Sequence, residues 1–180
     1  EKHEAYTEFD SPVPISHYSR SKYQGELIMQ SLLRRYYIVR AGWMFGGGMQ
    51  DKKFVARIVE LARSRSVLQI VDDKFGSPTY TRDFANGIRQ LIRTGWYGTY
   101  HLVNTGEPVS RFQVAQKILE YANLTSCQLQ PISSSHFPLS APRPRMEAAR
   151  NLRAELLGLN LMRSWQEALQ EYVATSLTSH

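Results

Sequence analysis

The sequence predicts an α/β fold that contains a parallel sheet, and three observations predict it. A helical pattern after Ser16 runs directly into "YYIVR" (36–40), a β-branched and aromatic stretch typical of a buried strand. Two further strand candidates, "VLQIV" and "GTYHLVN", alternate with helical patterns in the same way. The chain has 180 residues, enough for one domain with a proper core or for one large piece of a bigger domain.

The first third of the chain is predicted to hold a loop, a helix, a strand and a second loop. Residues 1–15 are polar and contain prolines, which favours a loop. Ser16 is the expected N-cap of a helix that runs to about Arg35. After the strand at 36–40, "AGWMFGGGMQDKK" lacks the G-x-G-x-x-G spacing of a dinucleotide-binding loop and is expected to be a flexible connection. Apolar residues at helical spacing are expected to turn the first helix toward the core: Leu27, Ile28, Leu32 and Leu33.

The rest of the chain is predicted to alternate helices and strands. Capping-box patterns at Ser110 and Ser164 mark the starts of two helices. The stretches "DDKFGSPTYTRD" and 133–145 are rich in turn residues and are expected to be loops. His101 lies in an apolar strand and is expected to be a hydrogen-bonded core residue. The expected helices are 53–63, 83–93, 110–121, 147–157 and 165–175, and the expected strands are 67–71, 98–104 and 127–132.

Composition limits the classes of function. The net charge of +6 suits a nucleic acid or a small anionic ligand such as a nucleotide sugar. The chain carries no helix-turn-helix, zinc-finger or RNA-binding signature, so we expect no nucleic-acid partner. No apolar run approaches the roughly 20 residues of a membrane span, and the polar opening "EKHEAYTEFD" lacks the pattern of a signal peptide, so we expect none. The single Cys127 fits a reducing cytoplasm, and the scattered histidines give no metal-ligand spacing, so we expect no metal.

The stretch "HYSRSKYQGE" (17–26) holds the most informative pair of side chains. Tyr18 and Lys22 are four residues apart at the start of the expected helix, so they project from the same face. An ammonium that close to a phenol favours the phenolate, and such a phenol can transfer a proton near neutral pH. An arbitrary Tyr-x-x-x-Lys is more often a solvated helix face. The residues around the pair therefore have to distinguish a catalytic pair from a solvated helix face.

Five blocks in order carry a resemblance to a known family. "YTEFDSPVPISHYSRSKYQGE" resembles the active-site segment of extended short-chain dehydrogenases/reductases, and it is especially similar to the dTDP-4-dehydrorhamnose reductase family. That family's later motifs are matched, in sequence order, by "VRAGWMFGGG", "VDDKFGSPTYTRDFA", "GTYHLVNTGEPVSRFQVAQKI" and "APRPRMEAARN". The resemblance covers nearly the whole chain, and the co-linear set is far more specific than any single motif.

The resemblance implies a fold and a reaction. The fold would be the C-terminal part of a Rossmann-like doubly wound parallel sheet plus a smaller α/β substrate-binding lobe. Residues 1–66 would belong to the NAD(P)-binding part, and 67–180 mainly to the sugar-nucleotide lobe, with the two interleaved. Tyr18 would be the general acid that protonates the C4 carbonyl oxygen of a nucleotide-linked 4-keto-6-deoxy sugar, while hydride arrives from NADPH or NADH. Lys22 would favour the phenolate and hydrogen-bond the nicotinamide ribose.

Further site residues follow from the same resemblance. Trp43 would pack on the sugar or the nicotinamide, with core packing as the alternative. Lys74 stands where the family commonly has glutamine, and it would contact the diphosphate or face solvent. Arg143 would bind the diphosphate, whereas Arg145 is expected to be an exposed basic residue. The remaining expected cofactor-binding residues are Arg40 and Gly42, and the remaining expected substrate-binding residues are Gly76 and Thr79.

Some parts of the family pattern are absent, and alternatives stay open. The glycine-rich phosphate turn and the Ser or Thr of the catalytic triad would precede Glu1, so we expect a C-terminal portion that alone binds NAD(P)H weakly or not at all. The expected role is cytoplasmic, in the dTDP-rhamnose supply for cell-wall polysaccharide. One alternative is an epimerase or dehydratase of the same superfamily. Another is a non-catalytic binding subunit, like the reductase-like regulatory subunit of methionine adenosyltransferase. The sugar, the choice of NADH or NADPH and the oligomeric state, with a homodimer as one option, stay open.

Overall fold

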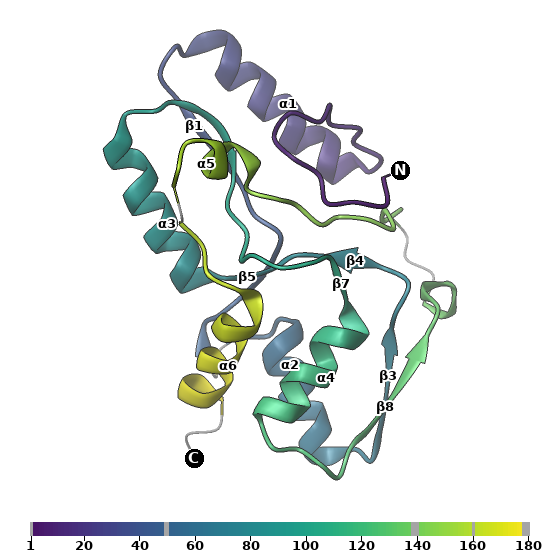
Figure 1. The fold of residues 1–180 in the computed structure, drawn as a ribbon. Helices are drawn as coiled ribbons and strands as arrows, with labels where there is room; N and C mark the ends of the chain where they lie inside the picture. The colour runs from purple at the N-terminus through teal and green to yellow at the C-terminus, as the bar shows by residue number, and fades with distance from the viewer. Residues whose placement is uncertain (1, 49–50, 138–140, 160, 178–180) are drawn as a thin grey trace.

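Parallel strand pairs joined through helices form the framework of the chain (Figure 1). The computed structural model describes residues 2–48, 51–137, 141–159 and 161–177, so parts of the two predicted loops at 41–53 and 133–145 lie outside the described residues. The helices are α1 (His17–Leu32), α2 (Phe54–Ser64), α3 (Thr81–Thr94), α4 (Arg111–Tyr121), α5 (Leu152–Leu156) and α6 (Trp165–Ser176), with a short 3-10 helix at Ser134–His136. The strands are β1 (Tyr37–Arg40), β2 (Trp43–Phe45), β3 (Val67–Val71), β4 (Phe75–Gly76), β5 (Pro78–Tyr80), β6 (Gly98–His101), β7 (Val109–Ser110) and β8 (Gln128–Ile132).

Within the described residues, the strands form four two-stranded ladders. The pairs β1·β6, β2·β5 and β3·β8 are parallel, whereas β4·β7 is antiparallel. Gly42 permits one of these pairings, because a Cβ at this position would stand 2.2 Å from the carbonyl oxygen of Ser77. The backbone N–H of Trp43 donates to that same oxygen at 2.9 Å. The predicted α/β class with parallel strands is confirmed.

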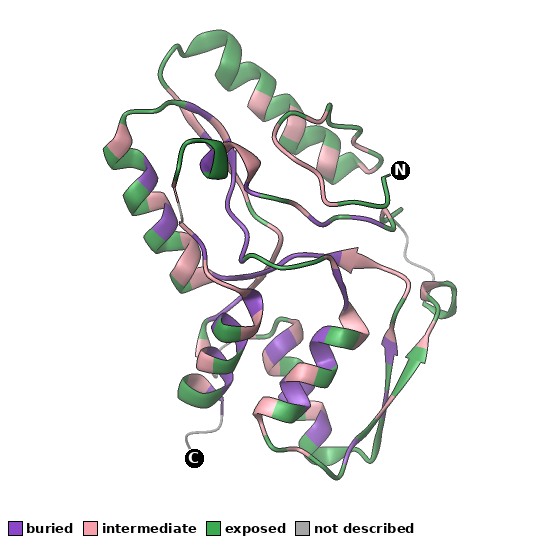
Figure 2. Cartoon of the chain, viewed as in Figure 1, coloured by how far each residue is buried: buried purple, intermediate pink, exposed green. Residues whose placement is uncertain are grey.

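Two hydrophobic clusters divide the interior. The larger one joins α2, α4 and α6 to β2, β3 and β5, and the smaller one joins α3 and β6 to the segment around α5. Figure 2 shows the buried residues concentrated on the facing sides of these elements. Helix α2 packs with the larger cluster. The division predicted after residue 66 stays a prediction, and α2, which precedes that boundary, packs in the same cluster as α4 and α6.

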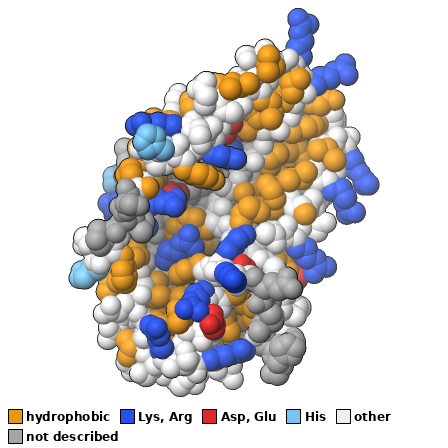
Figure 3. Space-filling model, turned by 180° about the vertical axis from the view of Figure 1, so that it is seen from behind, with side chains coloured by type: hydrophobic (Ala, Val, Ile, Leu, Met, Phe, Trp, Pro, Cys, Tyr) orange, Lys and Arg blue, Asp and Glu red, His pale blue; other side chains and the backbone are white. Residues whose placement is uncertain are grey.

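Helix α1 differs from the other long helices because it contains no buried residue. The stripe predicted to face the core is exposed: Leu27 by 39%, Ile28 by 49%, Leu32 by 75% and Leu33 by 51%. That prediction is wrong for this chain, because no described element covers this face of the helix (Figure 2). Seen from behind, hydrophobic side chains gather over the upper half of the molecule, where α1, β1 and α3 lie (Figure 3).

Most predicted elements are present, with differences at their ends and in the predicted loops. The strand at 67–71 and the helices that follow the capping boxes of Ser110 and Ser164 are confirmed. The short strands β2, β4, β5 and β7 lie in stretches that were not predicted as strands. The predicted helix over 147–157 is limited to α5, since the preceding residues form bridges instead, Met146 with Phe75 and Ala149 with Tyr6. None of the described helices has the length and apolar character needed to cross a membrane.

Candidate functional site

The first turns of α1 present the predicted catalytic pair to solvent. Ser16 caps the helix, and its hydroxyl accepts from the backbone N–H of Ser19 at 3.1 Å. Tyr18 is 70% exposed and Lys22 is also exposed. Among the described residues, neither side chain makes a hydrogen bond or an ion pair, so both polar groups are available to a ligand. Their spacing of one helical turn places them on the same face of α1.

A bidentate ion pair ties the same helix to the sheet. The Nε of Arg40 on β1 lies 2.9 Å from Oε1 of Glu26, and its Nη2 lies 2.5 Å from Oε2. Glu26 is one turn beyond Lys22 and continues the row of Tyr18 and Lys22 along α1. The guanidinium of Arg40, predicted to bind cofactor, is thus occupied by this carboxylate. Its visible role is to set the position of α1.

Trp43 and Gly76 meet in a close contact. A Cβ on Gly76 would stand 2.2 Å from Cε2 of the Trp43 indole, so only glycine leaves room for this ring. The indole Nε1 donates to Oε2 of Glu147 at 2.9 Å. The space above Gly76, which the sequence reading reserved for a ligand, is therefore filled by the Trp43 side chain.

Arg111, which the sequence reading missed, lies over the same indole. Its guanidinium carbon is 3.7 Å from the Trp43 ring centroid and 4.8 Å from the Phe54 ring centroid. Burial lowers the pKa of Arg111 to about 10, and the charge of Arg143 acts in the same direction while Glu147 opposes it. The sequence signal for Arg111 was its position directly after the N-cap Ser110, inside the capping box that fixes the first turn of α4.

The loop residues predicted to bind substrate divide into two groups. Lys74 donates from Nζ to the carbonyl oxygen of Arg143 at 2.9 Å, so these two predicted residues come together. Thr79 is 0% exposed and its hydroxyl donates to the carbonyl oxygen of Ser77 at 3.3 Å. Thr79 is thus closed off from solvent, which argues against the predicted direct contact with a ligand. The physical reason is that β5 pairs with β2 and passes into the larger core.

Two acidic residues organise the loop that begins after β3. Asp72 accepts a hydrogen bond from the hydroxyl of Ser110, the cap of α4. Asp73 accepts from the hydroxyl of Ser133 at 2.8 Å and from the backbone N–H of Ser134 at 2.9 Å. Partial burial of the Asp73 carboxylate acts to raise its pKa. The hydrogen bonds from Ser133 and Ser134 outweigh this effect, so the pKa of Asp73 is lowered. The carboxylates serve to hold the loop, and among the described residues no acidic, histidine or cysteine cluster could hold a metal ion.

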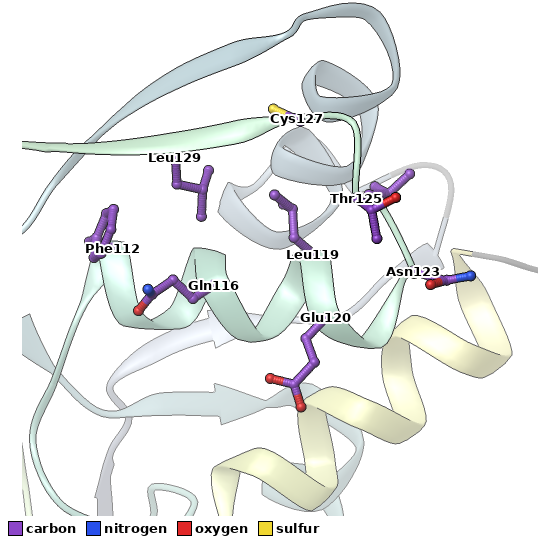
Figure 4. A pocket seen from close by; sticks show the side chains of 9 residues that line it. Phe112, Gln116, Leu119, Glu120, Asn123, Thr125, Cys127 and Leu129 are labelled. Atoms are coloured by element: carbon purple, nitrogen blue, oxygen red, sulfur yellow. The ribbon is translucent and has the colours of Figure 1, made fainter.

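Several hollows of similar size lie elsewhere on the described surface, and two of them bear on the predicted site. One of about 490 Å³ lies between α4 and β8 and contains none of the predicted site residues (Figure 4). Cys127 lines it, and burial raises the pKa of this thiol. The other, of about 470 Å³, lies beside β4, next to the loop of Lys74. It is lined by Lys2, His3, Phe75, Glu107, Pro108, Arg145 and Met146.

Comparison with known proteins identifies relatives along almost the whole chain. Residues 1–178 match the family model described as the RmlD substrate binding domain. A dTDP-4-dehydrorhamnose reductase of Mycobacterium tuberculosis is 34% identical over 97% of this chain. The crystal structure of a dTDP-4-dehydrorhamnose reductase of Clostridium acetobutylicum superimposes with a TM-score of 0.91 at 33% identity over 97% of the chain. One from Bacillus anthracis, in complex with NADP, gives a TM-score of 0.90 at 37% identity, also over 97%.

These relatives are longer than the chain. The chain spans 57% of the length of the mycobacterial reductase and 60% of each of the two crystallised chains.

Proposed function

The chain belongs to the RmlD substrate-binding domain family, and from this membership we propose that it is the catalytic-helix and sugar-nucleotide part of a reductase. The substrate class would be a dTDP-linked 4-keto-6-deoxy sugar of the dTDP-4-dehydrorhamnose type, and the reductant would be NADPH or NADH. The names of the relatives support this choice of substrate, and the NADP complex of one of them supports the cofactor. We place the reaction in the cytoplasm.

One observation carries the proposal. Tyr18 and Lys22 share the exposed face of α1, and both are unengaged among the described residues. An unengaged phenol and an ammonium fit a nicotinamide and a keto sugar, since the phenol can donate a proton and the ammonium can donate to ribose hydroxyls. A phenol buried away from any ligand would not suit this chemistry.

Each of the site residues would then have a distinct role in the reduction. When bound, the nicotinamide supplies the hydride. Tyr18 would donate its hydroxyl proton to the C4 oxygen of the sugar as negative charge develops there. Lys22 would favour that charge from one turn away. The ion pair of Arg40 with Glu26 would hold α1 so that this pair keeps its direction.

The proposal can be tested by supplying the cofactor-binding strands. We would join the chain to the first part of the Bacillus anthracis relative, up to the point where the likeness begins, and follow NADPH oxidation with dTDP-4-dehydrorhamnose. We expect turnover that falls by at least about 100-fold in Tyr18→Phe, since general acid catalysis contributes about 10²–10⁴-fold. Sugar-nucleotide binding without turnover in the parent would instead identify a binding subunit. Equal turnover in the parent and the variant would overturn the role of Tyr18.

A further inference from the structure

The inference concerns the position of Arg111 at the start of α4. Ser110 caps this helix in a box with Gln113, and the Ser110 hydroxyl also donates to Asp72. The first turn of α4, where Arg111 lies, is therefore held by two interactions of the Ser110 side chain, one with Gln113 and one with Asp72. Its side chain lies against the rings of Trp43 and Phe54. A guanidinium stacked on two aromatic rings has little freedom left, which is the condition for a preorganised binding group.

Arg111 has no close anionic partner within the described part of the chain. Its side chain is partly buried, yet its guanidinium makes no ion pair and no hydrogen bond to a described residue. The carboxylate of Glu147 accepts a hydrogen bond from the Trp43 indole and favours the charged form of Arg111, but it forms no ion pair with the guanidinium. Because a poorly hydrated cation without a paired anion is unfavourable, the lowered pKa of Arg111 agrees with the geometry.

A second unpaired guanidinium lies nearby. Arg143 is close enough for its charge to disfavour the charged form of Arg111, and Lys74 anchors the backbone of Arg143 through the carbonyl oxygen at 2.9 Å. Arg143 is exposed and likewise makes no ion pair with a described residue. Two guanidinium groups whose charges act on each other, each without an ion pair among the described residues, suit a ligand with several acceptor oxygens and more than one negative charge.

We propose that Arg111 is a further diphosphate-binding residue, beside the Arg143 already expected to contact this group, and that Trp43 is the support that positions Arg111. This inference rests on the proposed function, because the diphosphate is the anionic group of that substrate class. It changes the role predicted for Trp43, whose ring is covered by Gly76 and Arg111. Arg111 is the contact residue, and Trp43 acts through it.

The test measures binding of three probes to the chain: dTDP, thymidine and inorganic pyrophosphate. In Arg111→Met we expect the affinity for dTDP and for pyrophosphate to fall about 10- to 100-fold, the usual effect of losing hydrogen bonds to a charged group. The affinity for thymidine should not change. Arg111→Lys should lie between the parent and Arg111→Met, because an ammonium keeps the charge but cannot bind in a bidentate manner. Arg89→Met, which removes an exposed arginine on α3, is the matched control and should bind as the parent does.

The outcomes separate this inference from the proposed function. Unchanged dTDP affinity in a cooperatively folded Arg111→Met, or an equal loss for thymidine, would overturn the inference. A lower unfolding midpoint with unchanged dTDP affinity would show that Arg111 only packs against Trp43. Loss of dTDP affinity in Arg111→Met, together with absence of sugar reduction in the parent, would refute the reductase and leave the diphosphate site standing. Trp43→Leu should reproduce the dTDP defect, and equal dTDP affinity in Trp43→Leu and the parent would overturn the positioning role.

Discussion

The guanidinium of Arg40 on β1 donates hydrogen bonds from Nε and Nη2 to the carboxylate of Glu26 on α1. Both side chains are mostly shielded from water, 27% and 18% exposed. Among the described residues, this ion pair joins the sheet to a helix that buries none of its own residues. The direction in which Tyr18 and Lys22 point therefore depends strongly on one electrostatic contact.

Breaking this contact should loosen α1 and spare the two hydrophobic clusters. We expect Glu26→Gln to lower the free energy of unfolding by about 1–3 kcal/mol, because a partly buried guanidinium loses its anion. Hydrogen exchange should accelerate in α1 and stay unchanged in α4 and α6. The reference variant is Glu60→Gln on α2, whose pair with Arg57 is exposed and should matter by less than about 1 kcal/mol. Equal exchange in α1 before and after the substitution would contradict the role given to this pair.

Gly76→Ala should disturb the site through Trp43. The new methyl group would stand 2.2 Å from the indole, so the ring has to move and its contact with Arg111 with it. We expect a loss of about 1–3 kcal/mol in stability, typical of overpacking, and a changed tryptophan emission spectrum.

Gly25→Ala provides the control for that experiment. Nothing lies within 4 Å of a Cβ at Gly25, which sits on the exposed helix α1. Here alanine should stabilise the helix by up to about 1 kcal/mol. Opposite signs at the two glycines would support the packing described, whereas a neutral Gly76→Ala would show that the indole is free to move aside.

The exposed stripe of α1 should matter for association more than for the stability of the chain itself. Leu32 is 75% exposed, so Leu32→Glu should change the free energy of unfolding by less than about 0.5 kcal/mol. The same substitution should weaken or abolish assembly with cofactor-binding strands supplied from a relative, because an apolar face of this kind suits burial against protein. Leu156→Glu, at a similarly exposed leucine on α5, is the matched control. Sedimentation of the mixed fragments would measure the difference, and equal assembly by both variants would refute the role of the stripe.

The residues that the sequence predicts well are those whose structure is local. The caps at Ser16, Ser110 and Ser164 all form as capping boxes, because each needs only residues three positions apart. The Tyr18 and Lys22 pair is predictable for the same reason. Thr79 and Arg111 are not, since the first is buried by the pairing of β2 with β5 and the second is placed by a ring from β2. Such long-range contacts leave no periodic signal in a single sequence.

The absence of long-range contacts from the sequence signal also explains why the apolar stripe of α1 was wrongly predicted to face the core. Its apolar period is real, but a period shows only that a face avoids water and not which segment covers it. The error at 147–157 has a related cause, because Asn151 exchanges hydrogen bonds with the backbone of Val103 at 2.8 and 2.9 Å and draws the chain into an extended path before α5. Helical propensity is outweighed there by tertiary pairing.

His101 should make the stability of the chain depend on pH in a defined window. Its side chain is 4% exposed, and its Nδ1 lies 3.2 Å from the carbonyl oxygen of Arg150, which confirms the core position predicted for it. Burial lowers the pKa of His101 below the ordinary value of 6.5, with Glu8 opposing and Arg40 adding to the effect. Below about pH 6.5 the unfolded chain therefore binds a proton that the folded chain does not.

The sign follows from this difference in proton binding. The stabilisation from the neutral imidazole is complete above about pH 6.5 and is lost as the pH falls toward the folded pKa, with a slope of at most about 1.4 kcal/mol per pH unit. Urea unfolding at several pH values between about 8 and 5.5 should show the decrease in the parent and a flatter curve in His101→Gln. An NMR titration of the five histidines would identify the residue directly. Parallel curves for the two proteins, or a His101 resonance that titrates at or above pH 6.5, would show that another group is responsible.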